Sequence, residues 1–197
     1  MRMRFPIIFL VVIIGSGCGG GSKSGGGSSN PVSPPPVTPP PKPVMVVSST
    51  SVAGGVLARR CLFTAGNASP ALTWSGAPAT ARSFALVMDD PDSAPIWAHW
   101  LVVDLPGTST SLVEDATLPV PARQGRTSGG TNRYVGPDPP SGNHTYRLRI
   151  YALSVPTLTI DLSRTWTRSQ FEAVFAGSII TSVELSFLAG ISSRIRV

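Results

Sequence analysis

The amino-acid sequence predicts a mainly β fold, a β-sandwich with short helices at its periphery. From about Ser48 onward, short apolar or alternating runs are separated by turns rich in Gly, Pro, Ser and Asp, which is the pattern of strands joined by turns. Only one segment of this region carries a clear helix signal, and no internal repeat is visible. One helix among many strands with irregular loops is typical of a sandwich with peripheral helical pieces.

Five runs are expected to form strands: Ala71–Trp74, Ser83–Asp89, His99–Asp104, Tyr146–Leu153 and Val183–Phe187. Because side chains alternate along a strand, one face of the second run should carry Phe84, Leu86, Met88 and Asp90. By the same rule, one face of the third run should carry Trp97, His99, Leu101 and Val103. One face of the fourth should carry His144, Tyr146, Leu148, Ile150 and Ala152. Each apolar face then has polar groups at one end.

The single helix signal lies between the fourth and fifth runs. The four residues from Ser169 to Glu172 fit a capping box, with Ser169 as the N-cap. Phe171, Val174 and Phe175 then form an apolar stripe, and Gly177 is a suitable stop. We therefore expect a short helix that begins at Ser169.

The first 17 residues have the organisation of an export signal. Arg2 and Arg4 precede an apolar run from Phe5 to Ile14, and small residues follow up to Cys18. The run has roughly half of the ~20 apolar residues that a transmembrane helix needs. The segment resembles a bacterial lipoprotein signal, in which the Cys is lipidated and becomes the N-terminus. The alternative is plain secretion after cleavage near Gly17.

Residues 19–43 are rich in Gly and Ser and then in Pro, which is typical of a spacer without a core. We expect a signal peptide at 1–17, a lipidated Cys18 with a linker at 18–47, and a folded domain at 48–197. A disulfide between Cys18 and Cys61, the two cysteines, would tie the linker to the domain and stabilise little. Cys61 is expected to be a small buried apolar residue instead.

The net charge of +6 and the isoelectric point near 10.2 first point to nucleic acid as a partner. Four of the 16 basic residues lie in the signal and the linker, however, and the remaining 12 arginines stand against 10 acidic residues. Arg147 and Arg149 form a short alternating basic pair, and the sequence shows no basic stripe. Nucleic acid is therefore not expected as a partner.

Both histidines of the chain lie beside turn-rich segments at predicted strand ends. If the runs 83–90 and 97–104 are antiparallel neighbours, Asp90 and His99 lie at the same edge of the sheet. His144 and Tyr146 open a later strand, directly after the Gly/Pro-rich segment 136–142. These four side chains are expected to rim a pocket with an apolar floor.

Such a pocket suits a small anion, because imidazole and phenol groups and the backbone N–H groups of Gly/Pro turns are donors. Asp90 would hold a histidine in its donating tautomer and favour its charged form. The simpler alternative is that these are ordinary turns. His99, between Trp97 and Trp100, would then be a hydrogen-bonded core histidine.

At these residues the sequence resembles the phosphatidylethanolamine-binding protein (PEBP) family, specifically its bacterial, Raf-kinase-inhibitor-like branch. The resemblance rests on three segments in the family's order: Ser69–Trp74, Asp90–Asp104 and Tyr134–Tyr146. The second contains Asp-Pro-Asp-Ser-Ala-Pro and Trp-Ala-His-Trp, and the third contains Gly-Pro-Asp-Pro-Pro and ends in His-Thr-Tyr. Three departures concern the ligand: Ser93 is an extra residue before Ala94, Thr145 stands where the family has Arg, and the stretch Gln124–Arg133 keeps glycines but lacks the family's Asn.

The resemblance implies an antiparallel β-sandwich whose pocket binds small anions such as phosphate or a phospholipid headgroup, and we expect no cofactor and no metal. It implies ligand binding by Asp90, Asp92, His99, Gly136, Pro137, Pro140, His144 and Tyr146. Alternation does not place Asp92 on the pocket face. The resemblance also implies a cis bond between Ala94 and Pro95.

The leading hypothesis is a non-catalytic module that binds small anions or phospholipid headgroups and is tethered to a membrane by the lipid on Cys18. It would lie in the bacterial cell envelope, at the outer membrane and facing the periplasm. A second hypothesis is an inhibitor or regulator of a protein partner, such as a protease or kinase, contacted through the loops of Leu105–Arg133.

A third hypothesis is an enzyme in which His99, His144 and an Asp form a metal site or an acid–base pair. No enzyme activity is expected, because the sequence has no HExxH, no GxSxG, no Cys cluster and no Gly-rich phosphate loop.

Overall fold

A computed structural model describes residues 44–191 of the chain. The predicted signal peptide, Cys18 and most of the predicted linker lie outside the described residues. Strand β1 (Val46–Ser48) already belongs to the folded unit, and the side chain of Met45 is buried in its core. The folded unit thus includes residues before Ser48, the boundary expected from composition.

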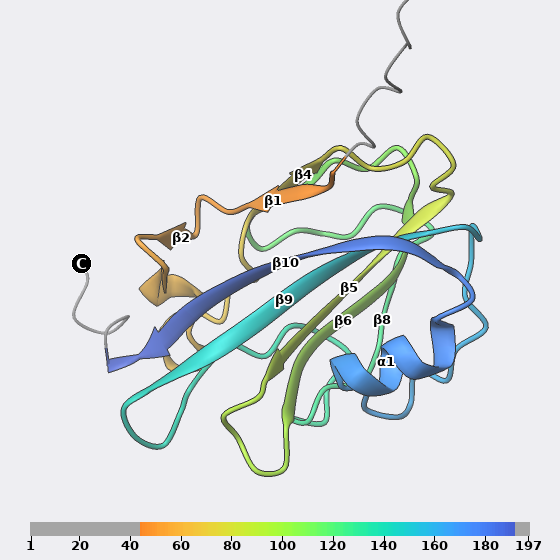
Figure 1. The fold of residues 1–197 in the computed structure, drawn as a ribbon. Coiled ribbons are helices and arrows are strands. Elements are labelled where there is room, and N and C mark those ends of the chain that lie inside the picture. Colours follow the sequence, from red (N-terminus) through yellow and green to blue (C-terminus); the bar gives the residue numbers. More distant parts are fainter. Residues whose placement is uncertain (1–43, 192–197) are drawn as a thin grey trace, which may run out of the picture. The chain divides into compact units, whose positions relative to one another are not determined.

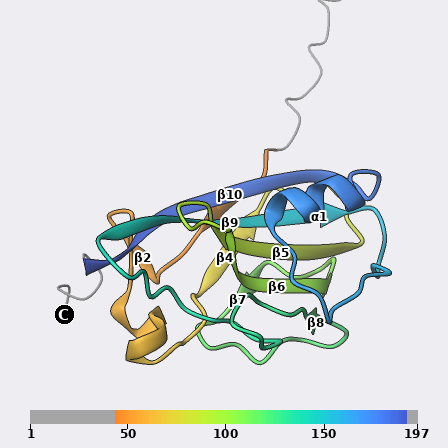
Figure 2. The ribbon, with the colours of Figure 1, turned by 90° about the horizontal axis from the view of Figure 1, so that it is seen from below.

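Within the described residues, two sheets form the domain (Figure 1). The small sheet has the order β1–β4–β7, with β4 at Leu72–Ser75 and β7 at Ser111–Leu112. The large sheet has the order β2–β3–β10–β9–β5–β6–β8, and Figure 2 shows β10, β9, β5 and β6 following one another in this order. Its strands are β2 (Val52–Ala53), β3 (Val56–Leu57), β5 (Ser83–Asp90), β6 (Trp97–Pro106), β8 (Arg123–Gln124), β9 (Asn143–Leu153) and β10 (Ile179–Gly190).

Neighbouring strands are antiparallel except β3 and β10, which are parallel. The mainly β sandwich predicted from the sequence is confirmed.

Two apolar clusters pack against the large sheet, one on each face. The cluster between the sheets contains alternate residues of β5 and β9, such as Leu86 and Ile150, and residues of the small sheet such as Trp74. The rings of Trp74 and Phe84 meet edge to face, with centroids 5.6 Å apart. Cys61, 0% exposed, belongs to the same cluster, as predicted. Removal of this apolar surface from water is the main favourable term in folding.

On the opposite face, helix α1 (Arg168–Phe175) packs on a second cluster through Phe171 and Phe175. The rings of Phe171 and Tyr151 of β9 lie 5.0 Å apart, centroid to centroid. Two short 3₁₀ pieces, η1 (Arg59–Cys61) and η2 (Phe63–Ala65), follow β3. The predicted short peripheral helices are confirmed. Among residues 44–191, no helix has the length and apolarity that crossing a bilayer requires.

The faces predicted for β5 and β9 are confirmed, but the face predicted for β6 is wrong. Trp97 and His99 lie at a pocket, whereas Leu101 and Val103 pack on the helix side. The register shifts between Met88 and Asp89, where β6 has one residue more than β5. Such a bulge reverses the alternation, so the residues after His99 lie on the faces opposite to those expected.

Helix α1 begins before Ser169, the predicted N-cap. The N-cap is Thr167: its hydroxyl accepts the N–H of Gln170 (3.5 Å), and the Gln170 side chain accepts the N–H of Thr167 (3.1 Å). The carboxylate of Asp89 accepts the N–H of Arg168 (3.1 Å), one of the donors that a helix start leaves without an intrahelical partner. This contact favours the earlier start.

Candidate ligand pocket

A pocket of about 550 Å³ lies where β5 ends and where β6 and β9 begin. Strands β5 and β6 pair antiparallel, as do β5 and β9, so these three strand ends meet at one edge of the sheet, as the sequence predicts. They supply Asp90, His99 and Tyr146. Trp97 at the start of β6, Phe63 of η2 and loop residues complete the wall, among them Asn67, Arg133, Gly136 and Asp138.

Asp90 is 2% exposed, and its carboxylate accepts several hydrogen bonds. Its Oδ2 accepts from Nδ1 of His144 (2.7 Å) and from Oγ of Ser93 (2.9 Å), and its Oδ1 accepts the backbone N–H of Asp92 (2.9 Å). Burial by itself would raise the pKa of this carboxyl, but the three hydrogen bonds, that of His144 first, hold the pKa below its usual value. Asp90 therefore carries its negative charge at neutral pH.

His99 is held by the backbone. Its Nδ1 lies 2.7 Å from the carbonyl oxygen of Val135, which can only accept, so Nδ1 carries a proton. Burial lowers the pKa of the imidazole, although the Val135 carbonyl and the charge of Asp90 act in the other direction. The neutral ring therefore has an unprotonated Nε2, and this is the ring nitrogen that is left for a ligand.

Aromatic rings surround these polar groups. The ring of Tyr146 meets His99 edge to face (centroids 5.1 Å apart) and stacks with His144 (6.4 Å) and Phe187 (6.1 Å). Burial raises the pKa of the Tyr146 hydroxyl, and the charge of Asp90 and a hydrogen bond to it raise the pKa further, so the phenol stays neutral. Trp97 is 39% exposed, and its ring centroid lies 6.5 Å from that of His99.

Gly136 brings the loop between β8 and β9 against the segment of η1 and η2. A Cβ at this position would overlap the carbonyl oxygen of Cys61, which also accepts the Tyr134 hydroxyl (2.9 Å). The N–H of Gly136 donates to Oδ1 of Asn67 (2.7 Å), and Nδ2 of Asn67 donates to the carbonyl of Tyr134 (3.4 Å). This backbone N–H is therefore used within the protein, contrary to the expectation that Gly/Pro turns leave such donors to a ligand.

Five of the eight residues predicted for the site line the pocket: Asp90, His99, Gly136, Pro140 and Tyr146. His144 is not in the lining, and it reaches the pocket through its hydrogen bond to Asp90. Asp92 is exposed, and its carboxylate accepts the N–H of Thr145 (2.7 Å). Pro137 is buried, and its carbonyl accepts the N–H of Phe63 (3.2 Å). Asp92 and Pro137 thus position loops and lie outside the lining.

The Ala94–Pro95 bond is cis, as the resemblance implies. Comparison with known proteins then gives the family. Residues 47–189 match the family model for "Phosphatidylethanolamine-binding protein". The chain belongs to the phosphatidylethanolamine-binding protein (PEBP) family.

Solved structures agree with this assignment. The crystal structure of YbcL from Escherichia coli, described as a new member of the mammalian PEBP family, has a TM-score of 0.67 and 31% identity, covering 75% of this chain and 98% of YbcL. CT736 from Chlamydia trachomatis has a TM-score of 0.64 and 30% identity, covering 74% of this chain and 96% of CT736.

Curated relatives match a shorter part of this PEBP-family chain. A UPF0098 protein of Methanothermobacter thermautotrophicus is 46% identical over 92 residues, 44% of this chain and 61% of the relative. Escherichia coli YbcL is 42% identical over 107 residues, which are 49% of this chain and 58% of YbcL. The match thus spans about three fifths of these two relatives. The "Putative lipoprotein LppC" of Mycobacterium tuberculosis is 41% identical over 93 residues, 45% of each chain.

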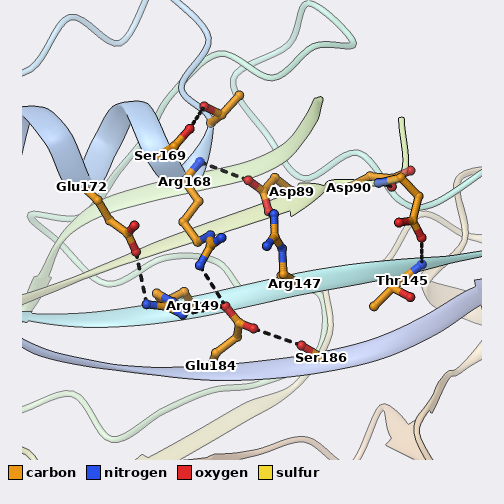
Figure 3. Close-up of polar contacts among 12 residues, drawn as sticks. Asp89, Asp90, Thr145, Arg147, Arg149, Arg168, Ser169, Glu172, Glu184 and Ser186 are labelled. Carbon is orange, nitrogen blue, oxygen red and sulfur yellow. Dashed lines mark hydrogen bonds and ion pairs between the residues drawn. The ribbon is translucent and has the colours of Figure 1, made fainter. Parts of the chain in front are cut away.

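Behind the pocket, the other face of the PEBP-family sheet carries a charged network (Figure 3). Arg149 of β9 joins Glu172 of α1 (3.2 Å) to Glu184 of β10 (2.8 Å), and Arg168 also reaches Glu184 (3.4 Å). Burial raises the pKa of Asp89, and its contacts with Arg168 and Arg147 offset this only in part. The network connects α1 to strands β9 and β10. Asp89 of β5 joins it by accepting the N–H of Arg168.

Sequence reasoning missed Asn67, Phe63, Arg133 and Asp138 as pocket residues. Asn67 contacts residues 67 and 69 positions away, which no local pattern reveals. The one local signal is the Gly66-Asn67 pair, since both residues have positive φ in the structure (140° and 57°) and Gly and Asn accept such angles.

Proposed function

We propose that the domain is a non-catalytic module that binds a phosphate group, free or as part of a phospholipid headgroup, at Asp90, His99 and Tyr146. The convergence of these side chains, each at most 4% exposed, at the end of a pocket of about 550 Å³ is the main support. A pocket of this size with a few convergent polar groups is typical of a small-molecule site.

The mouth of the pocket also supports this proposal. Arg133, which is exposed, offers a guanidinium group, and guanidinium groups suit phosphate oxygens. Phe63 and Trp97 are 54% and 39% exposed and offer apolar surface beside it. A charged headgroup with an apolar neighbour fits such a mouth.

Two potential nucleophiles, Ser93 in the pocket lining and Cys61 in the core, support binding without chemistry. Ser93 donates its hydroxyl to Asp90 rather than to a histidine, so it has no paired base. Burial raises the pKa of the Cys61 thiol to about 11, which disfavours the reactive thiolate. Within residues 44–191, no three His, Cys, Asp or Glu side chains are grouped so as to hold a metal ion.

Calorimetric titration of the full-length protein with phosphoethanolamine tests the proposal. Tyr146→Phe removes the hydroxyl and keeps the ring packing, and it should weaken binding about tenfold. Tyr151→Phe is the matched control, because Tyr151 lies on the same strand and its hydroxyl donates to Glu172 (3.0 Å) on the other face. It should bind as the wild type does. Absence of binding by the wild type would end the proposal.

We also propose that a lipid on Cys18 tethers this domain in the cell envelope, at the outer membrane and facing the periplasm. The order of the N-terminal residues supports it, as does the relative named as a lipoprotein. Cys18→Ala should abolish incorporation of labelled palmitate and release the protein from the membrane fraction. Cys61→Ala is the control and should keep both. A wild-type protein without label would contradict the tether, and membrane fractionation tests the location.

A further inference from the structure

The donors along the pocket wall are largely used by the protein itself. The hydroxyl of Ser93 donates to Asp90, and the N–H of Gly136 donates to Asn67. The N–H of Val135 donates to the carbonyl of His99 (3.0 Å), and the hydroxyl of Tyr134 donates to that of Cys61 (2.9 Å). An anion that has only acceptor atoms therefore finds few donors at the closed end of this pocket.

The same end is rich in acceptors. Nδ1 of His99 is committed to Val135, so Nε2 of the neutral ring offers a lone pair. The carboxylate of Asp90 is an acceptor only, and it is ionised. The charged residues of the lining are two carboxylates, Asp90 and Asp138, and one guanidinium, Arg133, so the lining has one negative charge in excess. A fully ionised anion placed beside Asp90 would be repelled.

We propose that the pocket selects a phosphate group that retains one proton, a phosphomonoester or inorganic phosphate, and that this P–OH donates to the Asp90–His99 end while Arg133 contacts the charged oxygens. This inference rests on the proposed function and specifies its ligand. Sulfate is the closest mimic that lacks the proton, and a phosphodiester likewise has no P–OH to donate.

The pH dependence follows from the ligand. A phosphomonoester loses its second proton at about pH 6, so the binding of phosphoethanolamine should weaken as the pH rises past this value, whereas inorganic phosphate keeps one P–OH throughout the tested range. The groups that face Asp90 and His99 are His144 and Tyr146 from β9, Asp92 and Ser93 from the loop after β5, and Arg133 and Asp138 from the loop before β9. If protonation of a histidine caused the stronger binding at low pH instead, sulfate would also bind more tightly as the pH falls over the same range.

The test is calorimetric titration of the full-length protein with phosphate, sulfate, phosphoethanolamine and glycerophosphoethanolamine at about pH 6 and pH 8. Phosphate and phosphoethanolamine should bind about 10- to 100-fold more tightly than sulfate and the diester at the lower pH, the value of a hydrogen bond to a charged group. Sulfate that binds as tightly as phosphate, or a diester that binds as tightly as phosphoethanolamine, overturns the inference and leaves the proposed function standing. If none of these ligands binds, the proposed function fails as well.

Two variants with the same change of charge give a matched comparison. Asp90→Asn supplies a donor where the wild type has only acceptors, so the preference for phosphate over sulfate should fall about tenfold or more. Asp138→Asn removes a negative charge at the exposed mouth. It should strengthen the binding of phosphate and of sulfate alike, so the preference for phosphate stays unchanged. A preference that falls equally in both variants would show that net charge alone discriminates, and would overturn the inference.

Vesicles mixed with the Cys18→Ala protein, which lacks the proposed lipid tether, distinguish the two sources of a phosphomonoester. Phosphatidylcholine vesicles that contain phosphatidic acid present a monoester, and those with phosphatidylethanolamine present a diester. Capture on the first alone supports a lipid monoester, and capture on neither, with soluble phosphate bound, supports a soluble one. Equal capture on both overturns the requirement for a proton on the phosphate.

Discussion

Asp89 and Asp90 are consecutive residues of β5, and their carboxylates lie on opposite faces of the large sheet. Asp90 accepts from His144 in the pocket, whereas Asp89 accepts the N–H of Arg168 at the start of α1 and lies 3.5 Å from Nε of Arg147. The bulge between Met88 and Asp89 falls at this point. The strand end that supplies the pocket carboxylate is thus fixed from behind by the helix.

His144→Ala is expected to raise the pKa of Asp90, because it removes the strongest hydrogen bond that lowers this pKa. A carboxyl whose folded pKa is depressed stabilises the fold above its unfolded pKa, and this contribution is lost as the pH falls through the folded pKa. Acid unfolding of the variant should therefore begin at a higher pH. A ¹³C NMR titration of the carboxyl measures the pKa. Thr145→Ala, which changes the next residue, is the control, and equal pKa values in both variants would contradict the prediction.

Glu184→Gln should destabilise the protein by about 1–3 kcal/mol at neutral pH, because it removes the charge that Arg149 and Arg168 contact. Burial raises the pKa of Glu184, but Arg149 outweighs it and holds the pKa below its ordinary value of 4.5. The stability difference should therefore vanish as the pH falls below this value. Urea unfolding at several pH values measures it. Asp115→Asn, an exposed change at a positive φ that Asn tolerates, should show little effect.

Thr167→Ala should cost about 1 kcal/mol of stability, because it removes the N-cap hydroxyl of α1. Ser169→Ala should change the stability by no more than a few tenths of a kcal/mol, because Ser169 lies in the first turn, where the better helix propensity of Ala offsets the loss of its hydroxyl. Chemical unfolding of both variants compares them. A larger loss for Ser169→Ala would return the N-cap to the position that the sequence pattern favours.

Gly136→Ala should destabilise the domain by about 1–3 kcal/mol, because the added Cβ meets backbone atoms of Cys61 and Phe63, which cannot rotate away. Phosphate binding should weaken too, since the loop that carries the pocket wall must move. Gly177→Ala is the control: its Cβ would meet nothing within 4 Å, so stability should change by less than about 0.5 kcal/mol or rise slightly. Thermal unfolding and calorimetry report both effects, and equal stabilities would contradict the steric argument.

Alternation along the chain predicts the site where the ladders are regular. Strand β9 pairs with β5 from Leu153 to Arg147 without a register shift, so Tyr146 and Ile150 lie on the predicted face. The same rule fails after His99, because one extra residue in β6 reverses the alternation and leaves no mark in the polar–apolar pattern.

Local patterns were ambiguous at the helix. Both Thr167–Gln170 and Ser169–Glu172 fit a capping box, and a contact with Asp89, 79 positions from Arg168, favours the first. The sequence likewise could not show which hydrogen-bond donors of the pocket are already used within the protein. Whether the N–H of Gly136 is free for a ligand depends on Asn67, a partner that only the folded chain brings near.

The partial exposure of Trp97 gives the domain an optical probe of its own. Three of its four tryptophans, Trp74, Trp100 and Trp166, are at most 4% exposed, whereas Trp97 is 39% exposed and lines the pocket. Iodide quenches fluorescence by collision, so it should act on Trp97 and spare the other three. A ligand that fills the pocket shields this indole, and the loss of quenching would report occupancy without any label on the protein or on the ligand.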